Sequence, residues 1–413
     1  MIGRAVGRVT GTRGPTVEAE LPLARVGEGV RICARDAAVH ARVVSLHGAR
    51  ALLAPLGALE GVALGDRVER DPAVLAAVLG TPLLGRAIDA RGAPLDGRPP
   101  PRGVRTATIA PPHEPRERRP CREIFWTGLR AIDGPLAFGR GARIGIFGPP
   151  GAGKSMLLDA IARGSCADAV VVALVGERGR EAERRLAQLD RRTTIVCATG
   201  DRAPAERVRA AELAFAQAGA LCGRGLDVLL VLDSLARFCS AAREQALASG
   251  EPPGRGGYPP SVFGLAARLL ERAGPIGRGS VTLVATVLSD GPDEADPVSE
   301  AARAALDGHL VLSERLARAG RFPAIDLPRS TSRTLDEVVA AGHSADARTL
   351  RAAAAALEES RDARALGVAS ADPVLVRCAA REPELEAFLR QGPAPSRPSA
   401  TLTALARLAD TLR

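Results

Sequence analysis

Hydrophobic and polar positions alternate in short segments over the first 70 residues. Gly, Pro or Asp interrupts the alternation every eight to ten residues or so, which is the spacing expected for short strands joined by turns. The pattern predicts strands at 6–10, 16–19, 29–34, 39–46 and 49–53. Half-buried strands of this length are typical of a small β-barrel. We therefore predict an N-terminal barrel over residues 1–72.

The pattern changes near residue 124, where near-continuous apolar runs begin to alternate with helical stretches. The runs lie at 143–147, 169–175, 193–199, 227–233 and 280–287. Strands that are apolar on both faces indicate a parallel sheet covered by helices. We predict an α/β domain over 73–335, with a Pro- and Arg-rich connection at 98–120. Helical spacing of Ala, Leu, Arg and Glu then predicts a helical domain over 336–413.

One glycine-rich loop follows the first of these runs and precedes a helical stretch. Its sequence is Gly148-x-x-x-x-Gly153-Lys154-Ser155, and Lys154 is the only lysine among 413 residues. Strand, glycine loop and helix are the context of a P-loop, whose backbone N–H groups cradle phosphates. A compact ammonium on a slim stem suits the β- and γ-phosphates better than the planar fork of arginine. The loop therefore predicts ATP binding, and the alternative is a glycine-rich turn with a chance Lys-Ser pair.

The predicted nucleotide-binding residues are those of the loop and the start of its helix. They are Gly148, Pro149, Pro150, Gly151, Ala152, Gly153, Lys154, Ser155 and Met156.

Two carboxylates stand at the ends of other apolar runs. Because ligands of open α/β sheets bind beyond the carboxyl ends of the strands, both are candidates for the same chemistry. Asp233, together with the Ser155 hydroxyl, is predicted to hold Mg²⁺, and the alternative role for Asp233 is a helix N-cap. Glu177 either orients and deprotonates the attacking water or serves as a first-turn helix acid, and spacing alone leaves these two roles open.

Composition narrows the classes of protein further. The net charge of +9 and a pI near 10 would suit nucleic acid, but the arginines are spread along the chain and aromatic residues make up only 2%. We therefore predict no dedicated nucleic-acid site. Seven cysteines without a C-x-x-C pair favour reduced thiols in a cytosolic protein. Since no apolar run reaches the ~18–20 residues needed to span a bilayer, we expect a soluble protein.

Several motifs together resemble those of one family, the ATPases of type III protein secretion and flagellar export, which are related to rotary ATP synthase subunits. The similarity runs over roughly residues 1–392. It implies a RecA-like P-loop core and an ATPase. The motifs are GRAIDARGAPLDG (85–97), TGLRAIDG (127–134), VGERGRE (175–181), DRAPAERVRAAELA (201–214), LDSLARF (232–238), GYPPSVF (257–263), LLERAG (269–274) and the long block 296–333.

The resemblance also implies roles for individual residues. Glu177 matches the carboxylate that activates water, and Arg178 and Arg237 match arginines that contact the terminal phosphates. Phe322 matches an aromatic that stacks on adenine. Arg333 matches an arginine finger that acts in the neighbouring subunit's site, so the resemblance implies a homo-hexamer. Lys154, Glu177, Arg178, Arg237 and Arg333 are thus the predicted catalytic set.

Three features depart from the family pattern. Pro149 and Pro150 stand in the loop, where each removes an N–H. The stretch 366–373 lacks the aromatic that usually forms the second wall of the adenine pocket. The chain also starts almost directly in the barrel, so we expect the N-terminal helical extension to be reduced to a few residues.

The implied function is a Mg²⁺- and ATP-dependent motor on the cytoplasmic face of the inner membrane. Its expected partners are a central stalk, stator or regulator proteins and chaperone–substrate complexes, with peripheral membrane association, and the segment 250–263 is expected to form a loop near the central pore. The nearest alternative is the flagellar export ATPase. More distant alternatives are a rotary synthase subunit, an RNA-translocating hexamer and a ring that does not hydrolyse ATP.

Overall fold

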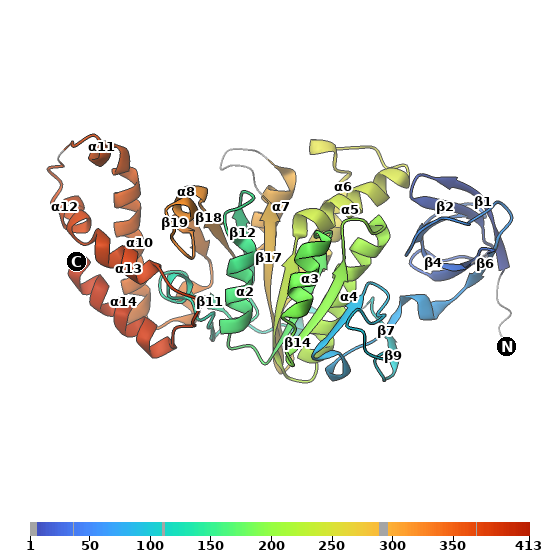
Figure 1. Ribbon diagram of the computed structural model, residues 1–413, viewed down its shortest axis with the longest axis horizontal. Helices are drawn as coiled ribbons and strands as arrows, with labels where there is room; N and C mark the ends of the chain where they lie inside the picture. Colours follow the sequence, from blue (N-terminus) through green and yellow to red (C-terminus); the bar gives the residue numbers. More distant parts are fainter. Residues whose placement is uncertain (1–5, 36, 110–111, 289–295, 369) are drawn as a thin grey trace. The chain divides into compact units, whose positions relative to one another are not determined.

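The structure is a computed structural model that describes residues 6–35, 37–109, 112–288, 296–368 and 370–413 (Figure 1). The chain divides into two compact units. The first unit comprises Met1–Glu114, Ala169–Arg224 and Leu232–Arg272. The second unit comprises Pro115–Asp168, Gly225–Val231 and Ala273–Arg413. The strand β15 (Asp227–Asp233) therefore begins in the second unit and ends in the first.

The first unit begins with a closed barrel, drawn in blue in Figure 1. Alternate side chains, such as Val30 and Ile32, point inward and are fully buried, as the alternating sequence pattern predicts. The structure confirms the barrel and adds a strand, β6, that the pattern did not predict. In barrel order the strands are β1 (Val6–Arg13), β2 (Thr16–Glu20), β5 (Arg50–Pro55), β4 (Ala38–His47), β3 (Gly29–Cys33) and β6 (Arg67–Arg70).

The rest of the first unit is α/β. The parallel strands run β13 (Ala169–Val175), β14 (Thr193–Ala198) and β8 (Arg86–Asp89), and the long helix α4 (Pro204–Cys222) packs on the first two. Part of the stretch expected to be a connection is ordered as β9 (Arg105–Ala107), which pairs with β7 (Ala76–Val78). The remaining helices are α3 (Gly179–Ala187), α5 (Leu235–Ala248), α6 (Pro260–Leu270) and the short η1 (Pro72–Leu75), η2 (Thr81–Leu83) and η4 (Arg255–Gly257).

In the second unit, the strand before the glycine loop lies between two parallel neighbours. This strand, β12 (Arg143–Gly148), pairs with β17 (Gly279–Leu288) and β18 (Gly308–Leu312), and β19 (Ile325–Ser332) pairs antiparallel with β18. The sequence pattern did not predict β18 and β19. The smaller elements are η3 (Pro115–Glu117), β10 (Ile124–Phe125), α1 (Arg130–Asp133), β11 (Phe138–Gly139), β16 (Gly274–Ile276), α7 (Pro297–Ala305) and α8 (Glu314–Arg318).

The second unit ends in helices, drawn in red in Figure 1, as the sequence predicts. Leu350 of α10 and Leu405 of α14 are buried where these two helices pack together. The helices are α9 (Leu335–Val338), α10 (Ala341–Glu359), α11 (Arg361–Ala365), α12 (Pro373–Ala380), α13 (Glu382–Leu389) and α14 (Pro398–Leu412). None of the described helices combines the length and the apolar character needed to cross a membrane. The barrel, the parallel α/β strands and the C-terminal helices confirm the predicted fold class.

Candidate nucleotide site

The glycine loop in the second unit connects β12 to the helix α2 (Lys154–Gly164). Gly151 and Gly153 adopt φ of +82° and +91°, the left-handed region that favours glycine. A Cβ added at either residue would meet no atom within 4 Å, so the loop needs these glycines for its backbone turn and not for space. Gly148 differs, because a Cβ there would lie 3.0 Å from the Cβ of Leu312. The backbone therefore curls around an open side, as a phosphate cradle requires.

Lys154 lies across this loop. Its Nζ donates hydrogen bonds to the carbonyl oxygens of Gly148 (2.7 Å) and Pro149 (2.8 Å), which holds the ammonium over the curl of the backbone. Ser155 follows in the first turn of α2 and is half-buried, whereas the Met156 side chain is 58% exposed. Because Pro149 and Pro150 supply no N–H, the loop has fewer backbone donors for a phosphate than its length suggests. The remaining N–H groups and the ammonium still fit a polyphosphate.

A cluster of charged residues forms in the first unit around Glu177. Glu177 follows β13 after Gly176, whose φ of +71° turns the chain out of the strand. The side chain is buried, and its Oε1 lies 3.1 Å from Nε of Arg237. Arg237 also donates to the Gly176 carbonyl oxygen. Glu177 precedes Arg178, the N-cap of α3, so it is not the first-turn acid of that helix; Glu181 takes that place.

The pKa of Glu177 is raised to about 8. Burial is the main cause, and a hydrogen bond to the Glu181 carboxylate and the negative charge of Asp233 add to it, while Arg237 acts in the opposite direction. The same hydrogen bond lowers the pKa of Glu181. Burial and the hydrogen bond between the two carboxyls therefore favour one proton shared by the pair. A buried carboxyl whose pKa lies near neutrality is suited to accepting a proton from water.

Asp233 stands at the end of β15 and is 9% exposed. The N-cap of the following helix α5 is Ser234, whose hydroxyl accepts from the Arg237 N–H at 3.2 Å. The alternative role of Asp233 as that N-cap is therefore wrong. The carboxylate lies 3.9 Å from Arg185, which sequence reasoning did not single out.

The chemistry of these donors fits Mg²⁺. The described residues contain no cluster of three His, Cys, Asp or Glu side chains arranged to hold a metal ion. Mg²⁺ does not require such a cage, because it is usually held by one or two protein oxygens together with waters and substrate phosphates. A carboxylate at Asp233 and a hydroxyl at Ser155 are hard oxygen donors of the right kind.

The other predicted residues lie at separate places. Arg178 is exposed at the start of α3. Phe322 is half-buried, and its carbonyl oxygen accepts from the Gln391 N–H at 2.8 Å. Arg333 is exposed just after β19, where its guanidinium donates to the Arg303 carbonyl oxygen at 3.4 Å. The structure thus brings together Glu177, Asp233 and Arg237 in the first unit and residues 148–156 in the second.

The comparisons with known proteins agree with this geometry. The nucleotide-binding domain of the ATP synthase alpha/beta family matches residues 128–332. A type 3 secretion system ATPase of Sinorhizobium fredii is 43% identical over 401 residues, which cover 93% of this chain and 88% of that protein. The chain belongs to the family of type III secretion ATPases and flagellum-specific ATP synthases. ATP is therefore its substrate.

Other members of this ATPase family are similar over the same length. A flagellum-specific ATP synthase of Pseudomonas aeruginosa is 41% identical over 403 residues, covering 94% of this chain and 89% of that protein. Among solved structures, the assembled ATPase EscN from the enteropathogenic E. coli type III secretion system matches with a TM-score of 0.92 at 35% identity, covering 98% of this chain and all of that one. EscN in complex with its central stalk EscO matches with a TM-score of 0.88.

Proposed function

We propose that this chain is the ATP-hydrolysing subunit of a homo-hexameric motor that drives protein export through a type III secretion apparatus. The observation that carries the proposal is the match to assembled EscN, which extends over 98% of this chain at 35% identity. A match over the barrel, the nucleotide-binding domain and the C-terminal helices supports the whole motor and not only its nucleotide-binding core.

We assign the chemistry as follows. Lys154 and the loop N–H groups bind the β- and γ-phosphates, with Ser155 and Asp233 holding Mg²⁺, which neutralises phosphate charge when bound. Glu177 accepts the proton of the attacking water, and Arg237 holds the carboxylate in place through its 3.1 Å ion pair. Arg178 contacts the terminal phosphates, and Phe322 stacks on adenine. Electrostatic stabilisation by fixed charges supplies most of the acceleration in such reactions.

Arg333 is the residue that makes the assembly necessary. It is exposed and lies just after β19, where its backbone N–H donates to the Asp307 carbonyl oxygen at 2.9 Å. An exposed arginine on an anchored backbone suits a finger that stabilises the transition state in a neighbouring subunit's site. Fingers of this kind contribute roughly 10³–10⁵ in rate in related phosphoryl-transfer enzymes.

The partners follow from the same assignment. The complex of EscN with its central stalk EscO supports a stalk that passes through the ring of this protein. We further propose stator or regulator proteins, chaperone–substrate complexes and a location at the cytoplasmic face of the inner membrane, with peripheral membrane association. The segment 250–263 is proposed to face the central pore. Its residues 260–263 are not part of a loop, because they begin α6.

Flagellar protein export is the second candidate function. The observation in its favour is the flagellum-specific ATP synthase of Pseudomonas aeruginosa, whose 41% identity is close to the 43% of the Sinorhizobium fredii secretion ATPase. Deleting the coding sequence separates the two functions. Loss of effector secretion with intact motility supports the secretion motor, whereas loss of motility with intact effector secretion supports the flagellar one.

The motor itself is tested by complementation between two inactive variants. ATP hydrolysis is measured against protein concentration for the wild type, Glu177→Gln, Arg333→Ala and a mixture of the two variants. We expect wild-type specific activity to rise with concentration, both variants to be inactive alone, and the mixture to recover part of the turnover. Activity that does not depend on concentration, or that survives the loss of Arg333, would contradict a site completed by a neighbouring subunit.

A further inference from the structure

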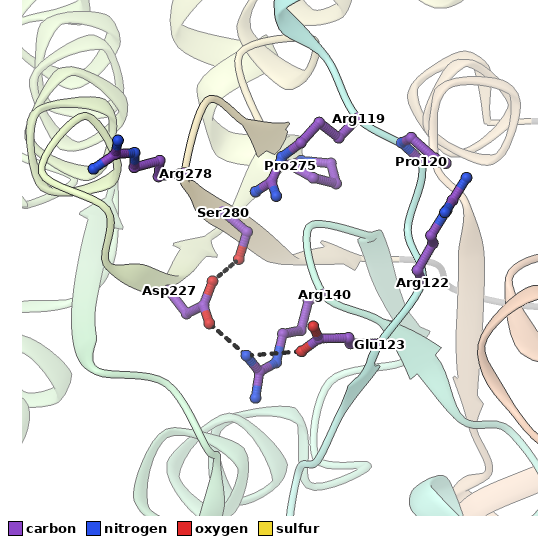
Figure 2. A pocket seen from close by; sticks show the side chains of 9 residues that line it. All are labelled: Arg119, Pro120, Arg122, Glu123, Arg140, Asp227, Pro275, Arg278 and Ser280. Carbon is purple, nitrogen blue, oxygen red and sulfur yellow. Dashed lines mark hydrogen bonds and ion pairs between the residues drawn. The ribbon is translucent and has the colours of Figure 1, made fainter.

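A pocket in the second unit lies away from the glycine loop. It has a volume of about 360 Å³ and lies at the amino ends of β15 and β17. Residues of four segments line it: Arg119, Pro120, Arg122, Glu123, Arg140, Asp227, Pro275, Arg278 and Ser280. Figure 2 shows these side chains around the hollow.

The pocket and the glycine loop are at opposite ends of the same parallel strands. In the register of β12 with β17, Gly148 at the start of the loop pairs with Leu288, whereas Ser280 lies eight residues earlier on β17. At about 3.3 Å per residue, the two places are roughly 25 Å apart along the strand. A ligand in this pocket would therefore not touch the residues assigned to ATP.

Four side chains of the pocket are linked in a row by hydrogen bonds and ion pairs, marked by dashed lines in Figure 2: Ser280, Asp227, Arg140 and Glu123. One oxygen of Asp227 accepts from the Ser280 hydroxyl at 2.6 Å, and the other lies 2.6 Å from Arg140. Arg140 is also 3.2 Å from Glu123, which is 71% exposed. Both carboxylates are therefore paired with the Arg140 guanidinium, which reduces their electrostatic repulsion of an incoming anion.

The charges of the remaining three arginines of the pocket are not neutralised by any carboxylate ion pair that the described residues show. Arg119 donates to the Gly279 carbonyl oxygen at 3.1 Å, a neutral partner. Arg122 and Arg278 are exposed and make no hydrogen bond or ion pair within the parts of the chain that the structure describes. In Figure 2 both lie outside the dashed chain of bonds, with Arg278 on the left of the view and Arg122 on the right, and their side chains extend away from the centre. Four arginines against two carboxylates leave a net charge of two positive at the pocket.

We propose that this pocket binds a small, multiply charged anion of the phosphate class. The Arg119 guanidinium would bind its oxygens, and the exposed side chains of Arg122 and Arg278 would turn inward to join it, since the planar fork of arginine matches phosphate in a bidentate manner. A volume of about 360 Å³ is at the lower end of the range for small-molecule sites, and it admits a diphosphate group. The bound anion would join the segment 119–123 to the turn that carries Arg278.

The test uses inorganic pyrophosphate as the probe and the Lys154→Ala variant of the full chain, which weakens binding at the glycine loop. Titration calorimetry should still find a site in this variant, with an affinity that falls as salt is added. Trp126, the only tryptophan, lies four residues from Arg122 and should change its fluorescence in the same titration. A Lys154→Ala protein that binds no pyrophosphate overturns the proposal, whatever the ATPase activity of the wild type.

Two matched double variants locate the site. Arg122→Gln with Arg278→Gln, added to Lys154→Ala, should weaken pyrophosphate binding at least tenfold. Arg397→Gln with Arg407→Gln removes the same charge from two exposed arginines elsewhere in the second unit and should have little effect. Equal weakening by both pairs would mean general attraction to an arginine-rich surface and would refute the pocket. Equal thermal midpoints for the two variants show that both are folded.

The source of the phosphate group is decided by competition. Phosphatidylcholine vesicles that contain phosphatidic acid are added to the pyrophosphate complex. If they displace pyrophosphate and lose this ability in the Arg122 and Arg278 double variant, the ligand is a lipid headgroup. If they do not displace it, the ligand is a free phosphate compound. Both results support the pocket.

Discussion

Nε of Arg237 lies 3.1 Å from Oε1 of Glu177. The other charged groups that act on this carboxyl most strongly, Glu181 and Asp233, are acidic. Arg237 is thus the cation that opposes burial, Glu181 and Asp233, all of which favour the protonated form of Glu177. The balance leaves the pKa of Glu177 at about 8. A base in this state is protonated at neutral pH in the free enzyme and gains activity as the pH rises.

The first prediction concerns this pH dependence. Because kcat/KM reports the free enzyme, its rising limb should have a midpoint near pH 8 in the wild type. Glu181→Gln should move the midpoint to lower pH, since it removes the carboxylate that accepts the Glu177 proton. Glu183→Gln, an exposed residue of the same helix, serves as the control. Coincident profiles for the wild type and Glu181→Gln would contradict the shared proton.

The second prediction concerns the only lysine. Lys154→Arg should lower ATP hydrolysis by about 10²-fold or more, the loss typical of removing one electrostatic contact to a transition state. The planar guanidinium cannot reproduce the bonds of Nζ to the carbonyl oxygens of Gly148 and Pro149. Arg163→Lys makes the reverse exchange on the same helix and should leave the rate near that of the wild type. A Lys154→Arg rate within tenfold of the wild type would show that the loop needs only a positive charge.

A third prediction concerns the contact between Arg303 and Phe147 of the P-loop strand. The guanidinium carbon of Arg303 lies 5.0 Å from the ring centre of the buried Phe147, and the Arg303 carbonyl oxygen accepts from Arg333. Arg303→Ala should lower the stability of the fold by about 1 kcal/mol through the lost cation–π contact. The backbone carbonyl oxygen that accepts from Arg333 remains in this variant, so kcat and KM should stay near those of the wild type.

Steady-state kinetics and urea unfolding measure the two effects separately. Arg318→Ala, which removes an exposed arginine of the same unit, is the control. An Arg303→Ala protein of unchanged stability would show that the contact with Phe147 adds nothing to the fold, and a large loss of kcat would show that the Arg303 side chain acts in catalysis.

The fourth prediction concerns Asp133, which is fully buried and accepts hydrogen bonds from the Thr127 N–H (2.9 Å), the Thr127 hydroxyl (2.7 Å) and the Gly128 N–H (2.9 Å). Burial outweighs these bonds and raises its pKa from 3.8 to about 6. The folded state therefore binds more protons than the unfolded state between these values. Stability from this group is present at low pH and is lost as the pH rises towards 6.

Urea unfolding of the wild type and Asp133→Asn across pH 4 to 7 measures this effect. The advantage of the wild type over the variant should shrink by up to roughly 3 kcal/mol, because a shift of about two units corresponds to about 1.4 kcal/mol each. Asp362→Asn, an exposed carboxylate of the same unit, is the matched control. An advantage that grows with pH would reverse the sign of the argument.

The sequence predicts the strands that are long and apolar on both faces. The runs at 143–147 and 227–233 correspond closely to β12 and β15, because full burial requires an unbroken apolar run. Strands that are short or that lie at the edge of the sheet were not predicted. β8 has only four residues between turns, and β19 contains Pro328 and several polar residues, since it pairs on one side only.

Local sequence pattern also predicts only some of the charged residues of the candidate site. Asp233 was predictable because it ends an apolar strand, and Glu177 because it follows one. Glu181 and Arg185 were not, since each acts through burial and packing that no local spacing specifies. The four-residue step from Glu177 to Glu181 was the one available signal, and it is weak because Glu177 lies before the helix begins.

Lys154 also makes this protein unusual in its reactivity towards amine-directed reagents. Apart from the chain terminus, the ammonium held by two loop carbonyl oxygens is the sole aliphatic amine in 413 residues. An amine-directed reagent, or an enzyme that acylates lysine side chains, therefore finds one internal target, and that target lies in the phosphate cradle. Covalent labelling of this chain would report directly on nucleotide occupancy, with no background from other side chains to subtract.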